Sequence, residues 1–86
     1  MSAGYAYFYL MGTDEEAVRE AVRAHVAHWR GLDLDDYTGG PFEDRTGGLI
    51  TFRSDGDHRA EQAVASDPFV TLGLLDRYWL KRWHPE

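Results

Sequence analysis

Residues 5–31 read YAYFYLMGTDEEAVREAVRAHVAHWRG, an aromatic run followed by a helical pattern, and this stretch decides the fold. Consecutive aromatic and aliphatic residues over 5–11 are typical of a β-strand. Alternate side chains of a strand point to opposite faces, so Tyr5, Tyr7 and Tyr9 share one face. Their hydroxyls need polar partners, which predicts that this face borders a partly wet cavity or a subunit interface.

A helix is expected directly after this strand. Thr13 and Glu16 have the spacing of a capping box, and Gly31 suits the position just past a helix end. Large apolar residues recur between them at helical spacing: Val18, Val22, Val26 and Trp29. The sequence therefore predicts an amphipathic helix whose apolar stripe faces a sheet.

The rest of the chain supplies three more strands and a second helix. Residues 34–42 read as an edge strand because they contain Pro41, residues 43–48 as a turn, and residues 49–53 as the next strand. A second helix opens at Ser54 and Asp57, again with capping-box spacing, and small apolar residues line its inner face: Ala60, Ala63 and Val64. After a short connector the last strand covers residues 74–83.

The order strand, helix, strand, strand, helix, strand predicts an α+β fold of the ferredoxin-like βαββαβ type, with a four-stranded antiparallel sheet. Two helices cover only one face of such a sheet. With Tyr5, Tyr7 and Tyr9 assigned to the other face, together with Tyr78 or Trp79, we expect a homodimer that pairs two sheets.

Length and composition narrow the class of protein. At 86 residues the chain forms a single domain, 1–86, and its net charge of −6 argues against nucleic acid or an anionic membrane as a partner. It contains no cysteine, which excludes disulfides, thiol nucleophiles and thiolate metal sites. The absence of an export signal and of a membrane span predicts a cytoplasmic protein.

His25 and Asp67 are the candidates for chemistry. His25 lies close to the apolar stripe of the first helix and should face inward, where an imidazole needs a hydrogen-bond partner. Asp67 extends the buried stripe of the second helix, and Pro68 after it is typical of a helix cap. Each residue has a structural interpretation, a satisfied core histidine and an N-cap. The functional interpretation is a general acid or base oriented by a carboxylate.

Other polar residues offer less. The histidines are too scattered to indicate a zinc site, with His58 and His84 expected in solvent. The acidic residues 33–36 lack the remaining ligands of a calcium loop. No nucleotide-binding or serine-nucleophile motif is present, so we expect neither a metal nor a cofactor. Gly39 and Gly40 could let a backbone approach a ligand closely, although such pairs are more often turns.

Three segments together resemble the YCII-related (YciI-like) family of small dimeric α/β-barrel proteins. They are Ala24-His25-Val26-Ala27, Gly39-Gly40-Pro41-Phe42, and Ser66-Asp67-Pro68-Phe69-Val70 with the later Gly73. The resemblance spans nearly the whole chain and implies that His25 and Asp67 form the active-site pair.

The resemblance implies a small cofactor-independent lyase or isomerase, for example one similar to dehydrochlorinases, acting on a small cyclic or aromatic metabolite. Gly39, Gly40, Tyr7 and Tyr9 would line the substrate pocket. A non-catalytic ligand-binding or accessory subunit would need the same polar pair in an apolar cavity. The sequence leaves both functions open, and a purely structural assembly domain is a third.

Overall fold

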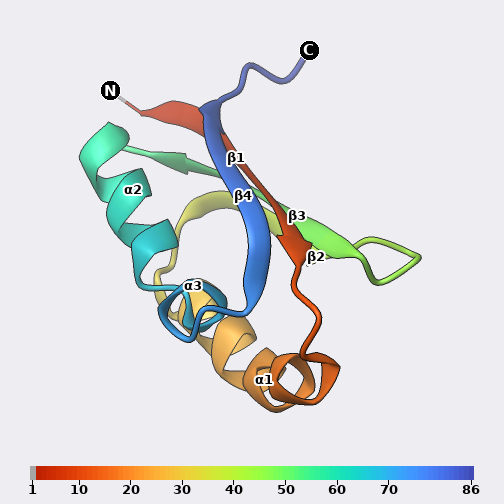
Figure 1. Cartoon of the computed structure of the whole chain (residues 1–86). Helices are drawn as coiled ribbons and strands as arrows, with labels where there is room; N and C mark the ends of the chain where they lie inside the picture. Colours follow the sequence, from red (N-terminus) through yellow and green to blue (C-terminus); the bar gives the residue numbers. More distant parts are fainter. Residues whose placement is uncertain (1) are drawn as a thin grey trace.

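A computed structural model describes residues 2–86 as an α+β fold, with a four-stranded antiparallel sheet and all helices on one side of it (Figure 1). The elements in chain order are β1 (Ala3–Met11), α1 (Glu15–Gly31), β2 (Asp35–Pro41), β3 (Gly47–Ser54), α2 (Asp57–Ala65), α3 (Pro68–Thr71) and β4 (Leu75–Arg82). The predicted ferredoxin-like order is confirmed, with α3 as the short connector before the last strand.

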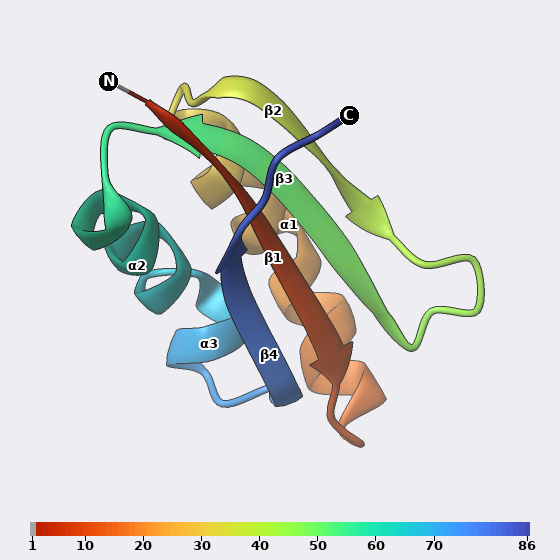
Figure 2. The same cartoon turned by 90° about the horizontal axis from the view of Figure 1, so that it is seen from above.

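The sheet has the strand order β2-β3-β1-β4, which places β1 in its interior (Figure 2). β1 pairs with β3 along one side, where Tyr7 lies opposite Ile50, and with β4 along the other, where Tyr9 lies opposite Tyr78. β2 is an edge strand, as expected, and its register shifts between Asp35 and Thr38. Asp36 in that interval has a φ of 53°, a left-handed conformation typical of a bulge.

The tyrosine face of β1 packs against the helices. Of the two predicted surroundings, a partly wet cavity or a subunit interface, the interface is therefore wrong, and so is the assignment of these residues to the face away from the helices. Tyr5, Tyr7 and Tyr9 are at most 3% exposed. The ring of Tyr7 stacks on that of Trp29 of α1 at 5.5 Å between centroids, and Tyr9 meets Phe69 of α3 edge-on. Tyrosine is suited to this interior because the helices provide acceptors for the hydroxyls of Tyr5 and Tyr7.

The inner stripe of α1 is also rotated from the expected one. Val22 is 43% exposed, whereas the buried positions follow one another at intervals of four residues: Ala21, His25 and Trp29. His25 and Trp29 both bind a carboxylate in the interior, and these bonds fix which side of the helix faces inward. The small apolar residues of α2 are buried as predicted: Ala60, Ala63 and Val64.

The helix caps differ from the two predicted capping boxes. Asp14, and not Thr13, caps α1, and its side chain accepts the N–H of Ala17 at 3.1 Å. α2 begins after Gly56 without a side-chain cap, while Ser54 bonds only the carbonyl of Gly56. Helix α1 runs through Gly31, and the left-handed residue that follows it is Asp33.

The face of the sheet away from the helices remains uncovered in the single chain (Figure 1). It is aromatic and apolar along its middle, where Phe8 contacts Phe42 and Trp79 at ring-centroid distances of 5.2 and 5.3 Å. Phe8 and Leu49 are each 38% exposed. We call the group Phe8, Phe42, Leu49 and Trp79 the open-face patch.

Candidate functional site

Asp67 lies at the point where α2 passes into α3, and its carboxylate is fully buried. Its extended backbone and the proline after it make it the N-cap of α3, as predicted, with Oδ1 accepting the N–H of Phe69 at 3.0 Å. This turn holds the carboxylate in place beneath α1. The backbone of the turn thus contributes directly to the position of the carboxylate.

Three further donors converge on the same carboxylate. Nδ1 of His25 lies 2.8 Å from Oδ1, so the predicted approach of the two residues is confirmed. The hydroxyl of Tyr7 and the indole N–H of Trp29 both donate to Oδ2 at 3.1 Å. Oδ1 therefore both caps α3 and binds the imidazole, while Oδ2 accepts the bonds of Tyr7 and Trp29.

This environment keeps Asp67 ionised. Burial alone would raise the pKa of Asp67, but the hydrogen bond and charge of His25 outweigh it, together with the donors Phe69 and Trp29. The net effect holds the pKa of this carboxyl below its ordinary value. The same carboxylate acts on Tyr7, whose pKa is raised first by burial and then by the charge of Asp67, so Tyr7 remains a neutral donor.

His25 is held firmly and yet keeps one ring nitrogen available. Its ring stacks on Phe69 at 4.0 Å between centroids with an interplanar angle of 10°, and the residue is 6% exposed. Among residues 2–86, Nε2 has no protein hydrogen-bond partner, although no buried nitrogen or oxygen in that range lacks one. Nε2 therefore reaches solvent. With Nδ1–H donated to an ionised Asp67, Nε2 is the proton acceptor of the neutral ring.

The predicted pocket residues do not all share one side of the sheet. Tyr9 lies beside His25, with the two rings edge-on and their centroids 5.6 Å apart. The hydroxyl of Tyr7 already donates to Asp67. Gly39 pairs with Ile50, whose buried side chain is on the helix side, and so belongs to the same side as His25. Gly40 is the next residue along β2 and belongs to the open face, so it can border the site only through its peptide groups.

Other features lie outside this centre. His58 and His84 are exposed, as expected. Within residues 2–86 no three acidic or histidine side chains gather in a way that could hold a metal ion, and no helix is long and apolar enough to cross a membrane.

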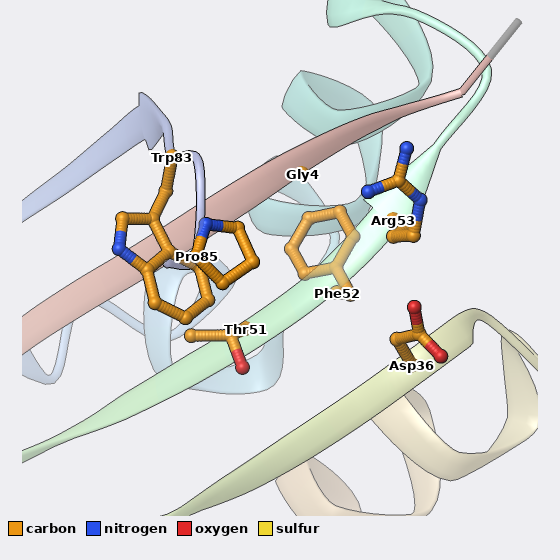
Figure 3. A pocket seen from close by; sticks show the side chains of 7 residues that line it. All are labelled: Gly4, Asp36, Thr51, Phe52, Arg53, Trp83 and Pro85. Carbon is orange, nitrogen blue, oxygen red and sulfur yellow. The ribbon is translucent and has the colours of Figure 1, made fainter.

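Two hollows on the described part of the chain, residues 2–86, are not lined by His25. One, open to solvent, lies at the β2–β3 turn around Phe42 and Asp44. The other is a cavity of about 50 Å³ where the C-terminal residues Trp83 and Pro85 pass over Gly4 (Figure 3).

Comparison with solved structures shows the fold. The 5-chloro-2-hydroxyhydroquinone dehydrochlorinase TftG of Burkholderia phenoliruptrix AC1100, in complex with 2,5-dihydroxybenzoquinone, matches with a TM-score of 0.82 and 20% identity over 94% of this chain and 93% of its own. Rv0793 of Mycobacterium tuberculosis matches with a TM-score of 0.61 and 15% identity over 100% of this chain and 96% of its own.

The chain has the dimeric α/β-barrel fold. No family model and no curated protein matches its sequence. The narrower resemblance to YCII-related proteins therefore stays a prediction, while the dimeric α/β-barrel fold itself is confirmed.

Two members of the site were not recognised as such in the sequence. The helical spacing predicts Trp29 in the apolar stripe, but its indole N–H binds Asp67, and its place one turn after His25 is the signal for this role. The predicted turn 43–48 includes Gly48, which instead lies in β3 under the hydroxyl of Tyr9. Its position opposite Tyr9 becomes evident only once the register of β1 and β3 is known.

Proposed function

We propose that this protein is a small enzyme of the lyase or isomerase type, in which His25 acts as the general base or acid and Asp67 orients it. The observation that carries the proposal is the bond from Nδ1 of His25 to a buried, ionised carboxylate, with Nε2 left open to solvent. A fixed imidazole of this kind can accelerate proton transfer by roughly 10²–10⁴-fold.

The chemistry follows from the direction of the hydrogen bonds. Asp67 fixes the tautomer of His25 that carries its proton on Nδ1, so the lone pair of Nε2 faces the substrate. Nε2 takes a proton from the substrate, and the electron pair of the broken bond forms a new π bond. In an elimination, a leaving group such as chloride departs with its own bonding pair. The imidazolium then returns its proton to solvent, with no cofactor in the cycle.

A small cyclic or aromatic substrate suits the surroundings of His25. The ring nitrogen opens among aromatic side chains, with Phe69 stacked on the imidazole and Tyr9 at its edge. Tyr7, Tyr9, Gly39 and the backbone of Gly40 make up the proposed pocket. The matched dehydrochlorinase acts on a chlorinated hydroxyhydroquinone and was solved with a dihydroxybenzoquinone. We take this compound class as the first substrates to test.

We also propose a homodimer, but with an interface formed by other residues than the tyrosines of β1. The tyrosines of β1 are covered by helices, so the partner would bind the open-face patch of Phe8, Phe42, Leu49 and Trp79. Two sheets meeting through this apolar middle would remove both patches from water.

Chloride release from 5-chloro-2-hydroxyhydroquinone tests the function. The wild type is compared with His25→Gln, whose folding is checked by circular dichroism, and with His58→Ala as a control in an exposed histidine. We expect His25→Gln to reduce the rate by about 10²–10⁴-fold and His58→Ala to leave it unchanged. Equal rates for wild type and a folded His25→Gln would contradict the proposed role.

The same assay separates the enzyme from its alternative. Tight binding of 2,5-dihydroxybenzoquinone by the wild type, without chloride release from the chlorinated compound, would favour a non-catalytic ligand-binding subunit. If the wild type neither binds the quinone nor releases chloride, its substrate belongs to another class of compound.

A further inference from the structure

The three tyrosines on the inner face of β1 differ in what their hydroxyls bind. The hydroxyl of Tyr5 donates to Asp57 at 2.6 Å, and that of Tyr7 donates to Asp67 at 3.1 Å. The hydroxyl of Tyr9 binds no group within residues 2–86, although the residue is only 3% exposed. Since no buried oxygen in this range lacks a partner, the Tyr9 hydroxyl must open to a solvent-reachable point.

The space around this hydroxyl is kept open by a glycine. A Cβ added at Gly48 of β3 would collide with the Tyr9 hydroxyl and come within 2.8 Å of the backbone oxygen of Gly40. Any other residue at position 48 would therefore displace the phenol ring. The sequence places a glycine where the side chain of Tyr9 needs to extend over the neighbouring strand.

The hydroxyl also remains a donor at neutral pH. Burial, followed by the charge of Asp67 and the neighbouring Tyr37, raises the pKa of Tyr9 to about 12. The ring of Tyr9 meets that of His25 edge-on, with centroids 5.6 Å apart and an interplanar angle of 67°. Two nearly buried rings in contact thus each carry one unpartnered polar atom that reaches solvent, a donor on Tyr9 and an acceptor on His25.

We infer that Tyr9 is a substrate-contacting residue whose hydroxyl donates to a carbonyl oxygen of the substrate while Nε2 of His25 removes a proton from the same molecule. This inference rests on the proposed function and narrows its substrate class. A donor beside a base is suited to a carbonyl compound that forms an enolate, such as the keto tautomer of a hydroxylated hydroquinone.

The reaction needs only the substrate and the side chains of His25 and Tyr9. Nε2 forms an N–H bond with the proton of the carbon next to the carbonyl, and the electron pair of the broken C–H bond forms a C=C bond. The former carbonyl π pair moves onto oxygen, where the Tyr9 hydroxyl stabilises the negative charge without losing its proton. The pair on oxygen then re-forms the carbonyl. Its C=C pair either takes the proton of the imidazolium at another carbon of the conjugated system, which gives an isomer, or forms a new C=C bond as a neighbouring chloride leaves with its bonding pair, which gives an elimination product.

The inference is tested by measuring how tightly 2,5-dihydroxybenzoquinone binds, with its visible absorption as the readout. The two variants compared are Tyr9→Phe and Tyr5→Phe. Tyr5→Phe is the matched control because it removes a hydroxyl from the same strand face, but one already bound to Asp57. We expect Tyr9→Phe to weaken binding about tenfold or more and to leave the unfolding midpoint in urea unchanged, because its hydroxyl has no partner in the fold. Tyr5→Phe should show the reverse, with a lower midpoint and unchanged binding.

A second pair of variants checks the position of the hydroxyl. Gly48→Ala should weaken binding by displacing the Tyr9 ring, whereas Gly31→Ala, which has open space around it, should not. Wild-type affinity in Tyr9→Phe, or a wild type that does not bind the quinone, would overturn the inference. In either case, a His25-dependent elimination or isomerisation would still leave the proposed function standing.

Discussion

Nδ1 of His25 lies 2.8 Å from Oδ1 of Asp67, although the two residues are 42 positions apart and belong to different helical segments. The same Oδ1 also caps α3 through the N–H of Phe69. Oδ1 of Asp67 therefore links α1 to the start of α3, and the orientation of the His25 ring depends on the N-cap of α3. Loss of this carboxylate should affect folding and chemistry together.

Asp67→Ala should be strongly destabilising. It removes an ionised acceptor with four donors and leaves the indole N–H of Trp29 and the hydroxyl of Tyr7 buried without it. Each buried donor left without an acceptor costs about 1–3 kcal/mol, so the unfolding free energy measured by urea denaturation should fall by about 3 kcal/mol or more. Asp55→Ala, in a side chain 80% exposed, should change it by less than about 0.5 kcal/mol. Equal effects of the two variants would contradict this account.

The stability of the protein should fall in acid because of the same residue. The pKa of Asp67 is lowered in the folded state, so its contribution is complete above the unfolded value of about 3.9 and is lost as pH falls through the lower folded value. Unfolding free energies measured from pH 6 to pH 2 should decline more steeply in the wild type than in Asp67→Asn, by up to about 1.4 kcal/mol per pH unit. Parallel curves would show that other groups cause the acid sensitivity.

Trp29→Phe should shift this acid transition. The variant retains an aromatic ring at a fully buried position but removes the N–H that donates to Oδ2 of Asp67. One donor fewer should raise the pKa of Asp67 toward its ordinary value, so the acid-dependent loss becomes smaller and is complete at a higher pH. The lost bond to a charged group should also cost about 1.5–3 kcal/mol at neutral pH. Chemical denaturation across the same pH series measures both effects, with an unshifted acid transition as the contrary result.

A charge in the open-face patch should prevent the proposed dimer. Phe8→Glu places a carboxylate in the middle of the uncovered sheet face, where a partner sheet would remove it from water. Sedimentation equilibrium at micromolar concentration should give a dimer for the wild type and a monomer for Phe8→Glu. Leu72→Glu, in a side chain 63% exposed at the end of α3, is the control and should remain dimeric. A wild type of 9.8 kDa in this measurement would contradict the dimer.

The sequence predicted the elements and their order well because each has a strong local pattern. The aromatic run of β1 and the periodic α1 depend on neighbours along the chain, and so does the Asp67–Pro68 cap. The approach of His25 to Asp67 could also be expected, because both occupy inner positions of helices that cover one sheet face. These features require only alternation, helical periodicity and the overall topology.

The sequence pattern could not show that the helices cover the face of β1 that carries the tyrosines. Both faces of β1 are apolar, so periodicity does not say which one the helices cover. The choice depends on the partners of the hydroxyls, and these lie far away in sequence: Asp57 for Tyr5 and Asp67 for Tyr7. The open position of Tyr9 over Gly48 likewise follows from the register of β1 with β3, which no local pattern specifies.

The irregular edge strand β2 has a consequence for how copies of this chain behave when crowded. A free strand edge is a template to which a further strand can add, and such addition can continue without limit into fibres. Here the register shift near Asp36 bends one edge and Pro41 ends it, while β4 at the other edge carries Arg77, Lys81 and Arg82. Both borders of the sheet are thus poor templates for open-ended growth. The proposed contact through the sheet face, by contrast, ends at two copies because each copy has only one such face.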